Sequence, residues 1–338
     1  MQPSVVMKRM ILRAPRRAEE APLSLEEVPD PVPGEDEIAI AVRACAVCRT
    51  DLQLAEGDLP ARRLPIVPGH QIVGEVVAVG ARVSSWSVGD RAAAGWLGSA
   101  CGVCIQCVAG KENLCEQARF TGWDIDGGYA TRAIVNASFA FPVPAGFDDA
   151  ASAAPLLCGG VIGFRSLGRA GVRPGMRVGL YGFGASALLA LQVARYWNCR
   201  VFVATRSIEE QARARAMGAV WAGGYDDPPP EPLDATVTFA PAGDVVIAAL
   251  RAAARGGTVA INAIHLDRVP SFSYDLLWWE RNLVSVSNYT RKDATELLGL
   301  SDRIPLRTRF EQHPLEAANE ALVRLREGKV EGSAVLVM

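Results

Sequence analysis

Residues 175–196, GMRVGLYGFGASALLALQVARY, decide the fold of the second half of the chain. The apolar run Val178–Tyr181 predicts a strand, Gly182-Phe183-Gly184 predicts a tight turn, and the Ala/Leu-rich residues after it recur at helical spacing. Gly182, Gly184 and Ala187 match G-x-G-x-x-G/A, a turn in which glycine lets a pyrophosphate approach the backbone at a helix N-terminus. Similar turns also serve as plain packing devices, so the motif favours dinucleotide binding without fixing it.

Composition indicates a globular protein of more than one domain. At 338 residues the chain exceeds what one core usually supports, so we expect two domains. The chain has 35 basic and 37 acidic side chains and a net charge of −2. This balance gives no broad basic surface for nucleic acid or an anionic membrane, and we expect small-molecule partners.

The chain carries no pattern typical of secretion or membrane insertion. Its first residues lack an apolar signal core with a small-residue cleavage site, and no uncharged apolar run reaches the roughly 18 residues of a membrane span. We therefore expect a cytoplasmic protein without a membrane segment, whose eight cysteines are reduced and whose cysteine spacing indicates metal rather than disulfides.

The two halves of the chain differ in their periodicity. Residues 1 to about 145 contain short β-rich runs separated by proline and glycine, typical of an irregular, mostly antiparallel barrel. Between about 146 and 290, apolar runs alternate with helical segments, which predicts a doubly wound parallel sheet. After that we expect a helix over Pro314–Glu327 and a strand over Ser333–Val337. The other expected strands are Glu37–Arg43, Ile72–Val79, Tyr129–Val135, Arg200–Thr205, Ala235–Phe239, Gly257–Ile264 and Leu283–Ser287.

Four cysteines follow the spacing Cys-x2-Cys-x2-Cys-x7-Cys, at Cys101, Cys104, Cys107 and Cys115. Four thiolates on a short glycine-containing loop can close around Zn²⁺ with no open position, which is the pattern of a structural site. An iron–sulfur cluster is an alternative, because Cys-x2-Cys-x2-Cys also begins ferredoxin-type motifs. A disulfide or unliganded loop is the remaining interpretation, but a polar loop of this length needs a metal to hold its shape.

A second candidate metal site depends on residue types rather than on a spacing motif. The other cysteines are Cys45, Cys48, Cys158 and Cys199, and His70 lies in the constrained turn Val67-Pro68-Gly69-His70-Gln71. Cys48, His70 and Cys158 are a candidate Cys₂His set, which leaves an open position on zinc and is therefore catalytic in character. We expect His265 and His313 to be ordinary surface or core histidines.

These motifs, in this order, resemble the zinc-dependent medium-chain alcohol dehydrogenases over essentially the whole chain. The resemblance implies an α/β fold with a β-rich GroES-like catalytic domain, 1–145 completed by 291–338, and a Rossmann cofactor domain, 146–290. The residues that carry the resemblance are Cys45-Ala-Val-Cys48-Arg49-Thr50-Asp51, Pro68-Gly69-His70, the four-cysteine loop, Pro155-Leu-Leu-Cys158-Gly-Gly and the turn at Gly182.

The resemblance also implies roles for single residues. Cys48, His70 and Cys158 would bind a reactive zinc, so each subunit would hold two zinc ions. Thr50 would hydrogen-bond the alcohol and pass on its proton, and Asp51 would orient His70. Further implied roles are pyrophosphate binding for Arg49, whose guanidinium suits it, and pocket lining for Trp96 and Trp123, although bare aromatic residues can equally be core residues.

The sequence departs from this family at two positions near the site. Gln71 stands where relatives usually carry glutamate, so we expect a less negative and more Lewis-acidic zinc that exchanges its ligands less readily. Gln53 stands where several relatives carry a histidine in the proton relay. An amide cannot shuttle a proton near neutral pH, so we expect protons to leave through a ribose hydroxyl and water.

Cofactor choice depends on the end of the second predicted strand of the cofactor domain. An NAD enzyme commonly places an acidic residue there to bind the ribose hydroxyls. This chain has Thr205, Arg206 and Ser207 instead, a cation and hydroxyl donors that suit a 2′-phosphate. We therefore favour NADP over NAD. The alternative is that Arg206 is a solvated residue and NAD binds without the usual acid.

The predicted function is hydride transfer between a primary aliphatic or aromatic alcohol and NAD(P), with the aldehyde as product or substrate. A relative that reduces an imine or an activated alkene is the enzymatic alternative, and Thr50 beside a full ligand set argues against it. A zinc-ribbon module that binds nucleic acid through residues 101–115 is disfavoured, because Lys111 and Arg119 are balanced by Glu112 and Glu116. We expect a homodimer or homotetramer, because relatives pair through the edge of the cofactor-domain sheet.

Overall fold

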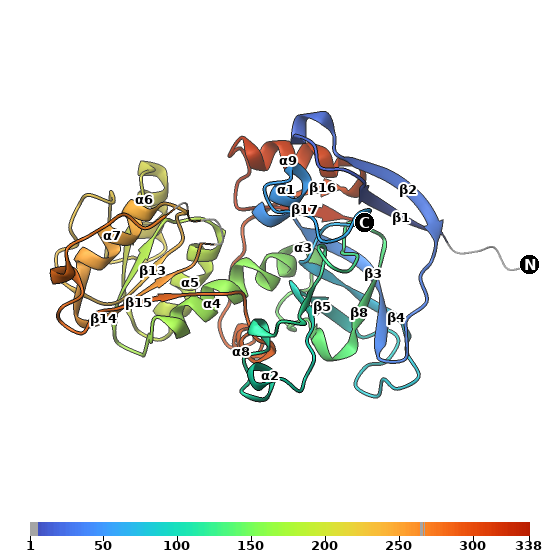
Figure 1. Cartoon of the computed structure of the whole chain (residues 1–338), viewed down its shortest axis with the longest axis horizontal. Coiled ribbons are helices and arrows are strands. Elements are labelled where there is room, and N and C mark those ends of the chain that lie inside the picture. The colour runs from blue at the N-terminus through green and yellow to red at the C-terminus, as the bar shows by residue number, and fades with distance from the viewer. Residues whose placement is uncertain (1–5, 264–265, 267) are drawn as a thin grey trace, which may run out of the picture. The chain divides into compact units, whose positions relative to one another are not determined.

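The computed structural model describes residues 6–263, 266 and 268–338, which form two compact units (Figure 1). The first unit runs to Cys158 and resumes at Thr290, and the second is Gly159–Tyr289. The sequence placed the first boundary after residue 145 and the second after residue 290. His265 and the expected strand end at Ile264 lie outside the described residues.

A seven-stranded sheet forms the centre of the first unit. The strands of this unit are β1 (Val6–Leu12), β2 (Leu23–Pro29), β3 (Glu37–Ala46), β4 (Ile72–Val79), β5 (Arg91–Ala94), β6 (Leu97–Ser99), β7 (Arg119–Phe120), β8 (Arg132–Asn136), β9 (Ala140–Pro142), β16 (Phe310–Pro314) and β17 (Ser333–Val337). The large sheet has the order β16-β17-β3-β4-β5-β9, with β8 paired to β3. Its pairs are antiparallel except β16–β17, and β1–β2 and β6–β7 form two-stranded sheets. The sheet is thus mostly antiparallel, as the β-rich pattern predicts.

Helices of the first unit are short and connect or cover these strands. They are α1 (Arg49–Glu56), α2 (Ile105–Val108), α3 (Ala150–Ala153), α8 (Arg291–Ser301) and α9 (Ala318–Arg326), with 3₁₀ turns η1 (Ala18–Glu20), η2 (Glu112–Leu114), η3 (Ala137–Phe139), η4 (Ala154–Leu157) and η6 (Leu315–Ala317). A continuous buried core of aliphatic residues from both ends of the chain fills the unit, including Ile38, Leu52, Ile72, Leu322 and Leu336.

The C-terminal tail completes the first unit. β17 pairs with β3 in antiparallel register, with Val335 opposite Ala46. The helix expected over Pro314–Glu327 begins later than its pattern suggests, because Pro314 ends β16, a strand that pairs in parallel with β17. The α-helix itself is α9, which begins at Ala318 after a 3₁₀ turn. Residues 310–314 form a strand because they pair with β17, and this long-range pairing is not visible in the local sequence.

The second unit is a doubly wound sheet. Its strands are β10 (Arg177–Tyr181), β11 (Arg200–Ala204), β12 (Trp221–Gly223), β13 (Leu233–Thr238), β14 (Ala253–Ile261) and β15 (Asn282–Ser285). They pair in parallel in the order β12-β11-β10-β13-β14-β15, the order of dinucleotide-binding sheets. The helices are α4 (Gly159–Arg169), α5 (Ala185–Tyr196), α6 (Ile208–Ala216) and α7 (Gly243–Ala252), with the 3₁₀ turn η5 (Tyr274–Leu276) (Figure 1). The predicted fold class is confirmed.

The stretch Ala150–Arg169 is 20 residues long and apolar enough to cross a membrane by length and composition. It is not one regular helix, because it contains α3, the 3₁₀ turn η4 and α4, with a break at Cys158 (φ −130°, ψ −74°). Of its most apolar window, 61% is buried inside the structure, as in core helices of globular proteins. This segment therefore gives weak support for a membrane span.

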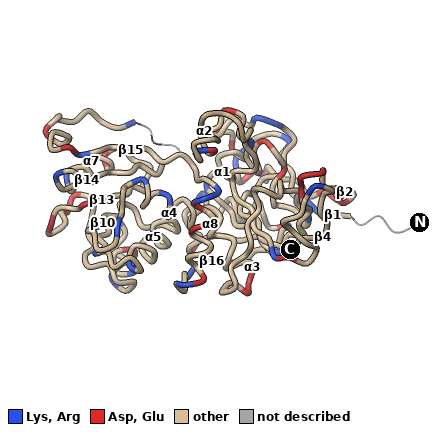
Figure 2. The backbone as a smooth tube through the Cα atoms, turned by 90° about the horizontal axis from the view of Figure 1, so that it is seen from below, with Lys and Arg blue, Asp and Glu red and all other residues tan. Residues whose placement is uncertain are grey.

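Charged residues are interspersed in both units. Figure 2 shows Lys and Arg positions scattered among Asp and Glu positions in both units. Many of them are paired, for example Arg177 with Asp234 and Arg324 with Glu311. No long single-sign stretch is seen among the described residues, in agreement with the net charge of −2.

Candidate metal and cofactor sites

Cys48, His70 and Cys158 meet inside the first unit and are called here the Cys48 cluster. Their ligand atoms lie within 4.8 Å of one another, although the residues come from three separate segments. Cys48 caps the N-terminus of α1, His70 follows Gly69 in the turn before β4, and Cys158 follows η4. Gly69 has a φ of +94°, a conformation that favours glycine and turns His70 into the unit.

The donor set of this cluster fits a tetrahedral zinc ion. Zinc–sulfur bonds of about 2.3 Å place two thiolates of a tetrahedron about 3.8 Å apart. The Sγ atoms of Cys48 and Cys158 are 3.8 Å apart. Two thiolates and one imidazole complete three of four positions, so the fourth would remain for water or substrate.

Asp51 holds the histidine of this cluster. Its Oδ1 atom lies 3.1 Å from His70 Nδ1 and accepts a hydrogen bond from Gly69 N. Its Oδ2 atom accepts from Cys48 N at 2.8 Å and from the Tyr129 hydroxyl at 3.1 Å. With Nδ1–H donating to Asp51, the Nε2 atom of His70 is free to bind a metal.

Protonation in the cluster follows from these contacts. The hydrogen bond from the Cys158 thiol is the main cause that lowers the pKa of Cys48 well below its usual range, and it raises the pKa of Cys158. Burial favours the neutral His70 ring, but the Asp51 carboxylate and Cys48 together outweigh burial and raise the pKa of His70 to about 10. A metal binds deprotonated thiols and a neutral imidazole, so metal binding at this cluster would be pH-dependent.

Thr50, Gln53 and Arg49 all lie on α1. Thr50 is buried, and its hydroxyl lies 3.7 Å from Cys48 Sγ. Arg49 is exposed on the first turn. The Gln53 side chain is half-buried, and its backbone oxygen accepts from Gly57 N and Leu59 N at the end of the helix.

Gln71 lies just before β4 and not on α1. It is buried, and its Nε2 atom donates to Ala46 O at 3.1 Å, so this hydrogen bond fixes the amide to β3.

An aromatic wall lies beside His70. Trp96 meets the His70 ring edge-on, with centroids 4.9 Å apart, and stacks on Trp123 at 5.7 Å. Phe120 stacks against Trp96, and the Arg62 guanidinium lies 3.8 Å from the Trp123 ring centroid. The two expected tryptophans are therefore brought together, whereas Phe120 and Arg62 gave no recognisable signal in the sequence.

Residues 101–115 form a separate group of ligands, called here the four-cysteine lobe. The Sγ atoms of Cys101, Cys104, Cys107 and Cys115 lie within 4.8 Å of one another, and those of Cys101 and Cys107 are 3.9 Å apart. Backbone N–H groups of Val103 and Cys104 lower the pKa of Cys101 to about 6. Four converging sulfur atoms fit a closed zinc site with no free position.

Glu112 anchors the four-cysteine lobe to the rest of the first unit. Its buried carboxylate accepts from Arg291 N at 2.9 Å and from Arg291 Nε at 3.2 Å. Arg291 is the first residue of α8, and its guanidinium also lies over the Phe139 ring. This ion pair therefore ties the lobe to the start of α8.

The glycine turn of the second unit has the predicted geometry. Gly182 has a φ of +93°, and a Cβ there would lie 2.9 Å from Ala240 N. A Cβ on Gly184 would meet no atom within 4 Å, so the backbone at the start of α5 is open to a ligand. Ala187 is fully buried, as expected of a small residue where helix and strand meet. The turn therefore offers free N–H groups at a helix N-terminus.

Thr205, Arg206 and Ser207 follow β11 at the same end of the sheet as Gly182. Thr205 is buried, and Ser207 caps α6 by accepting from Glu210 N while its hydroxyl donates to Glu209. Arg206 is exposed and makes no ion pair within the described chain. Its guanidinium is therefore available to an anionic group.

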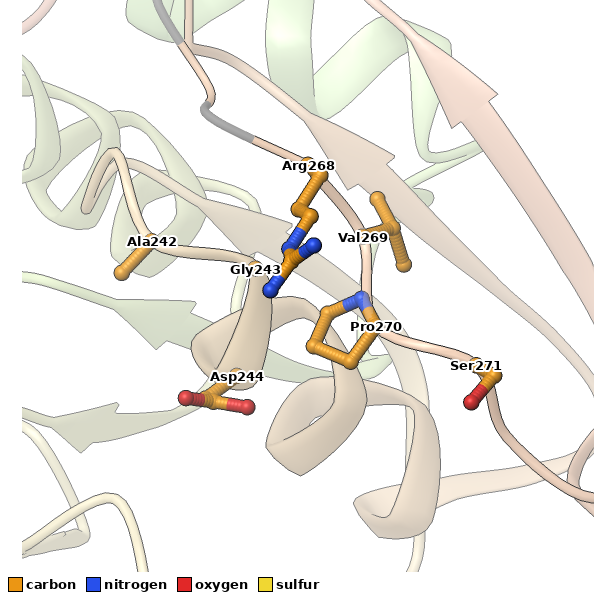
Figure 3. A pocket seen from close by; sticks show the side chains of 7 residues that line it. All are labelled: Ala242, Gly243, Asp244, Arg268, Val269, Pro270 and Ser271. Atoms are coloured by element: carbon orange, nitrogen blue, oxygen red, sulfur yellow. The ribbon is translucent and has the colours of Figure 1, made fainter.

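A cavity of about 620 Å³ opens at the start of α7 in the second unit. Figure 3 shows the Arg268 side chain extending across Gly243 toward Asp244, with Pro270 and Ser271 on the neighbouring segment. Gly243 is required here, because a Cβ would lie 1.9 Å from Arg268 O.

The chain matches known proteins over both units. The alcohol dehydrogenase GroES-like domain matches residues 34–145. The chain is 44% identical over 333 residues to a probable alcohol dehydrogenase, AdhA, of Mycobacterium tuberculosis (strain CDC 1551 / Oshkosh), covering 97% of this chain and 96% of the relative. It is 35% identical over 326 residues to an alcohol dehydrogenase of Geobacillus stearothermophilus, covering 93% and 95%.

A solved structure shows the same fold. The cobalt- and zinc-bound thermostable alcohol dehydrogenase from Pyrobaculum aerophilum matches with a TM-score of 0.88 at 24% identity, over 99% of this chain and 100% of that chain. Together with the ligand geometry, these matches define an oxidoreductase of the medium-chain class. The chain belongs to the zinc-dependent medium-chain alcohol dehydrogenase family.

Proposed function

We propose that this alcohol dehydrogenase oxidises primary aliphatic or aromatic alcohols to aldehydes, and reduces them in reverse, with two zinc ions per chain. The observation that carries the proposal is the Cys48 cluster, in which three ligand atoms from distant segments converge and leave one position open. The four-cysteine lobe would hold the second, structural ion. The imine or alkene reductase alternative has less support, because the matching relatives are named alcohol dehydrogenases.

Cys48, Cys158 and His70 Nε2 would hold the reactive zinc, which supplies Lewis-acid polarisation of the substrate oxygen when bound. Thr50 would hydrogen-bond that oxygen and pass its proton on to the next acceptor, because the Thr50 hydroxyl lies beside Cys48 Sγ. Asp51 keeps the Nδ1 proton on His70 and thereby fixes the tautomer that can bind a metal. Trp96 and Trp123 would exclude water and present an apolar wall to the carbon chain of the alcohol.

We infer that the cofactor is held by the turn at Gly182 and that NADP is preferred to NAD. Support comes from the exposed guanidinium of Arg206 after β11, where residues 205–207 contain no carboxylate and the nearby Glu209 carboxylate accepts from the Ser207 hydroxyl. Thr205 and Ser207 would add polar groups, and Arg49 would pair with the pyrophosphate. The proton would move through a ribose hydroxyl and water rather than through Gln53, since an amide does not titrate near neutral pH.

We also infer self-association through the edge strand β15 in a cytoplasmic protein. β15 pairs with β14 on one side, and the adjacent Trp278 is 58% exposed and Trp279 44% exposed. Exposed aromatic side chains beside an open strand edge favour pairing with a second copy. The eight cysteines are all free, as in a reducing compartment.

The deciding experiment combines metal analysis with a substrate panel. Anaerobically purified protein is expected to hold about two zinc ions per chain and to oxidise primary alcohols with a higher kcat/KM for NADP than for NAD. Matched primary and secondary alcohols of equal carbon number would test the substrate class. One zinc per chain without alcohol oxidation would contradict the proposal, and light scattering would test the oligomeric state.

A further inference from the structure

The carboxylate of Asp51 has all of its acceptor positions in use. An ionised carboxylate offers about four lone-pair positions, and Asp51 receives four donors while only 2% exposed. Three donors belong to the ligand segments themselves, Cys48 N, Gly69 N and His70 Nδ1. The fourth, the Tyr129 hydroxyl, comes from elsewhere in the chain.

Tyr129 is held tightly against the turn that presents His70. Its backbone N–H donates to Pro68 O at 3.0 Å, and its carbonyl accepts from Met10 N at 2.8 Å. Its ring fills the space beside Gly69, because a Cβ on Gly69 would lie 2.3 Å from the ring. The side chain is fully buried, so its hydroxyl has little freedom to choose another acceptor.

The hydroxyl remains a donor under all working conditions. Burial, with the nearby Asp51 charge as the next cause, raises the pKa of Tyr129 well above its usual range. The phenol therefore keeps its proton and points it at Asp51 Oδ2. Because the other donor to Oδ2 is the backbone of Cys48, the carboxylate plane is fixed from both the Cys48 and the Tyr129 sides.

We propose that Tyr129 is a positioning residue of the Cys48 cluster, whose hydroxyl fixes the Asp51 carboxylate and through it the direction of His70 Nε2. The inference rests on the proposed zinc site and adds a residue to it. It assigns to Tyr129 a role beyond packing, since the ring alone would fill the space beside Gly69. Losing the hydroxyl leaves Oδ2 with one donor, so the carboxylate can turn away from His70.

The test is Tyr129→Phe, which keeps the ring and removes only the hydroxyl. Zinc affinity is measured by competition with a chromophoric chelator, which resolves two metal equivalents per chain. We expect one equivalent to bind about 10-fold more weakly, as for other groups that orient metal-bound histidines, and the other to be unchanged. Cobalt substituted for zinc should show altered visible bands for the same equivalent, because those bands report ligand geometry.

Two controls separate positioning from general loss of a buried hydroxyl. Tyr289→Phe makes the same chemical change at another buried tyrosine and is expected to change neither equivalent. In an Asp51→Ala background, Tyr129→Phe should change metal affinity by less than about twofold, since the acceptor is gone. Should Tyr129→Phe not fold, a slowly exchanging Tyr129 hydroxyl proton in the wild type, perturbed by zinc, is the expected NMR signature, and its absence would count against the proposal.

Unchanged affinity and cobalt bands in Tyr129→Phe would overturn the positioning role, as would an equal loss in Tyr289→Phe or an undiminished loss in the Asp51→Ala background. These outcomes are distinct from failure of the proposed function. A protein that binds two zinc ions and responds as expected to Tyr129→Phe, but oxidises no alcohol, would contradict the proposed function alone.

Discussion

The four-cysteine lobe and the Cys48 cluster bring together ligands in opposite ways. The lobe takes its four sulfur atoms from 15 consecutive residues, in which Val103 and Ile105 are each 82% exposed and no aliphatic core is present. The Cys48 cluster takes three ligands from segments up to 110 residues apart, with His70 buried and both cysteines partly buried. We therefore expect the lobe to depend on its metal for shape more than the cluster does, because the surrounding fold and Asp51 also hold the ligands of the cluster.

The two sites also differ in the source of the hydrogen bonds that hold their ligands. In the lobe, hydrogen bonds to sulfur come from its own backbone, such as Cys104 N to Cys101 Sγ at 3.3 Å. In the cluster, Asp51 connects the ligands through buried hydrogen bonds, and the fold supplies the rest. A closed set of ligands stabilises structure, and an incomplete set held by the fold leaves room for chemistry.

The largest expected effect separates the two sites by function. Cys158→Ala should lower kcat/KM for alcohol oxidation by at least about 1,000-fold, because Lewis-acid stabilisation of several kcal/mol is lost. Metal analysis should fall to about one zinc per chain, with the lobe still loaded. Cys199→Ala, a buried thiol outside both ligand groups, is the matched control. Retained turnover in Cys158→Ala would mean that the cluster is not catalytic.

Breaking the lobe should affect stability more than chemistry. Cys104→Ser is expected to remove one zinc, lower the melting temperature by about 5–10 °C, and make residues 101–115 sensitive to protease. Turnover at 25 °C should fall by less than about 10-fold, because no ligand of the cluster is changed. A loss of activity as large as that of Cys158→Ala would remove the distinction between the sites.

Asp51→Asn tests the buried network that the lobe lacks. The neutral amide cannot hold the Nδ1 proton of His70 as a carboxylate does, so metal affinity and kcat/KM should fall by about 10- to 100-fold. Chelator competition would show whether only the cluster equivalent is weakened. Equal weakening of both equivalents would point to a general folding defect instead.

Gln71→Glu tests how added negative charge near the Cys48 cluster affects turnover. The buried amide donates to Ala46 O, and a carboxylate there would lose that bond and add negative charge near the cluster. We expect turnover to fall by about 3- to 10-fold and the pH–rate profile to move, because a more negative site weakens Lewis acidity. Turnover and a pH profile identical to the wild type would refute the idea that glutamine raises Lewis acidity.

The smallest expected effect concerns the attachment of the lobe. Glu112→Gln replaces charge-assisted hydrogen bonds to Arg291 with neutral ones, which should cost about 1 kcal/mol and lower the melting temperature by about 2–4 °C. Glu316→Gln, which breaks the exposed pair with Lys8, should change it by less than about 1 °C. Zinc content should be unchanged in both variants, and calorimetry gives the comparison.

Local patterns predicted the lobe, the glycine turn and most strands, because each depends on residues close in sequence. The strands Ile72–Val79 and Ser333–Val337 were predicted with the observed bounds. The Cys48 cluster could be chosen over Cys45 and Cys199 only through family resemblance, since its geometry depends on the chain path between residues 48 and 158. Tyr129 carried no sequence signal, because a tyrosine after two glycines is as typical of a strand start as of a hydrogen-bond donor.

One covalent detail of the first unit limits how this enzyme can be recombined. Cys158 is the last residue of the first unit, and Gly159 begins both the second unit and its helix α4. A chimera that exchanges the second unit for that of a relative would therefore be spliced at the peptide bond next to a proposed zinc ligand. Grafted modules would have to preserve the backbone path through that junction, so cofactor preference is best redesigned by point changes near Arg206 rather than by exchanging whole modules.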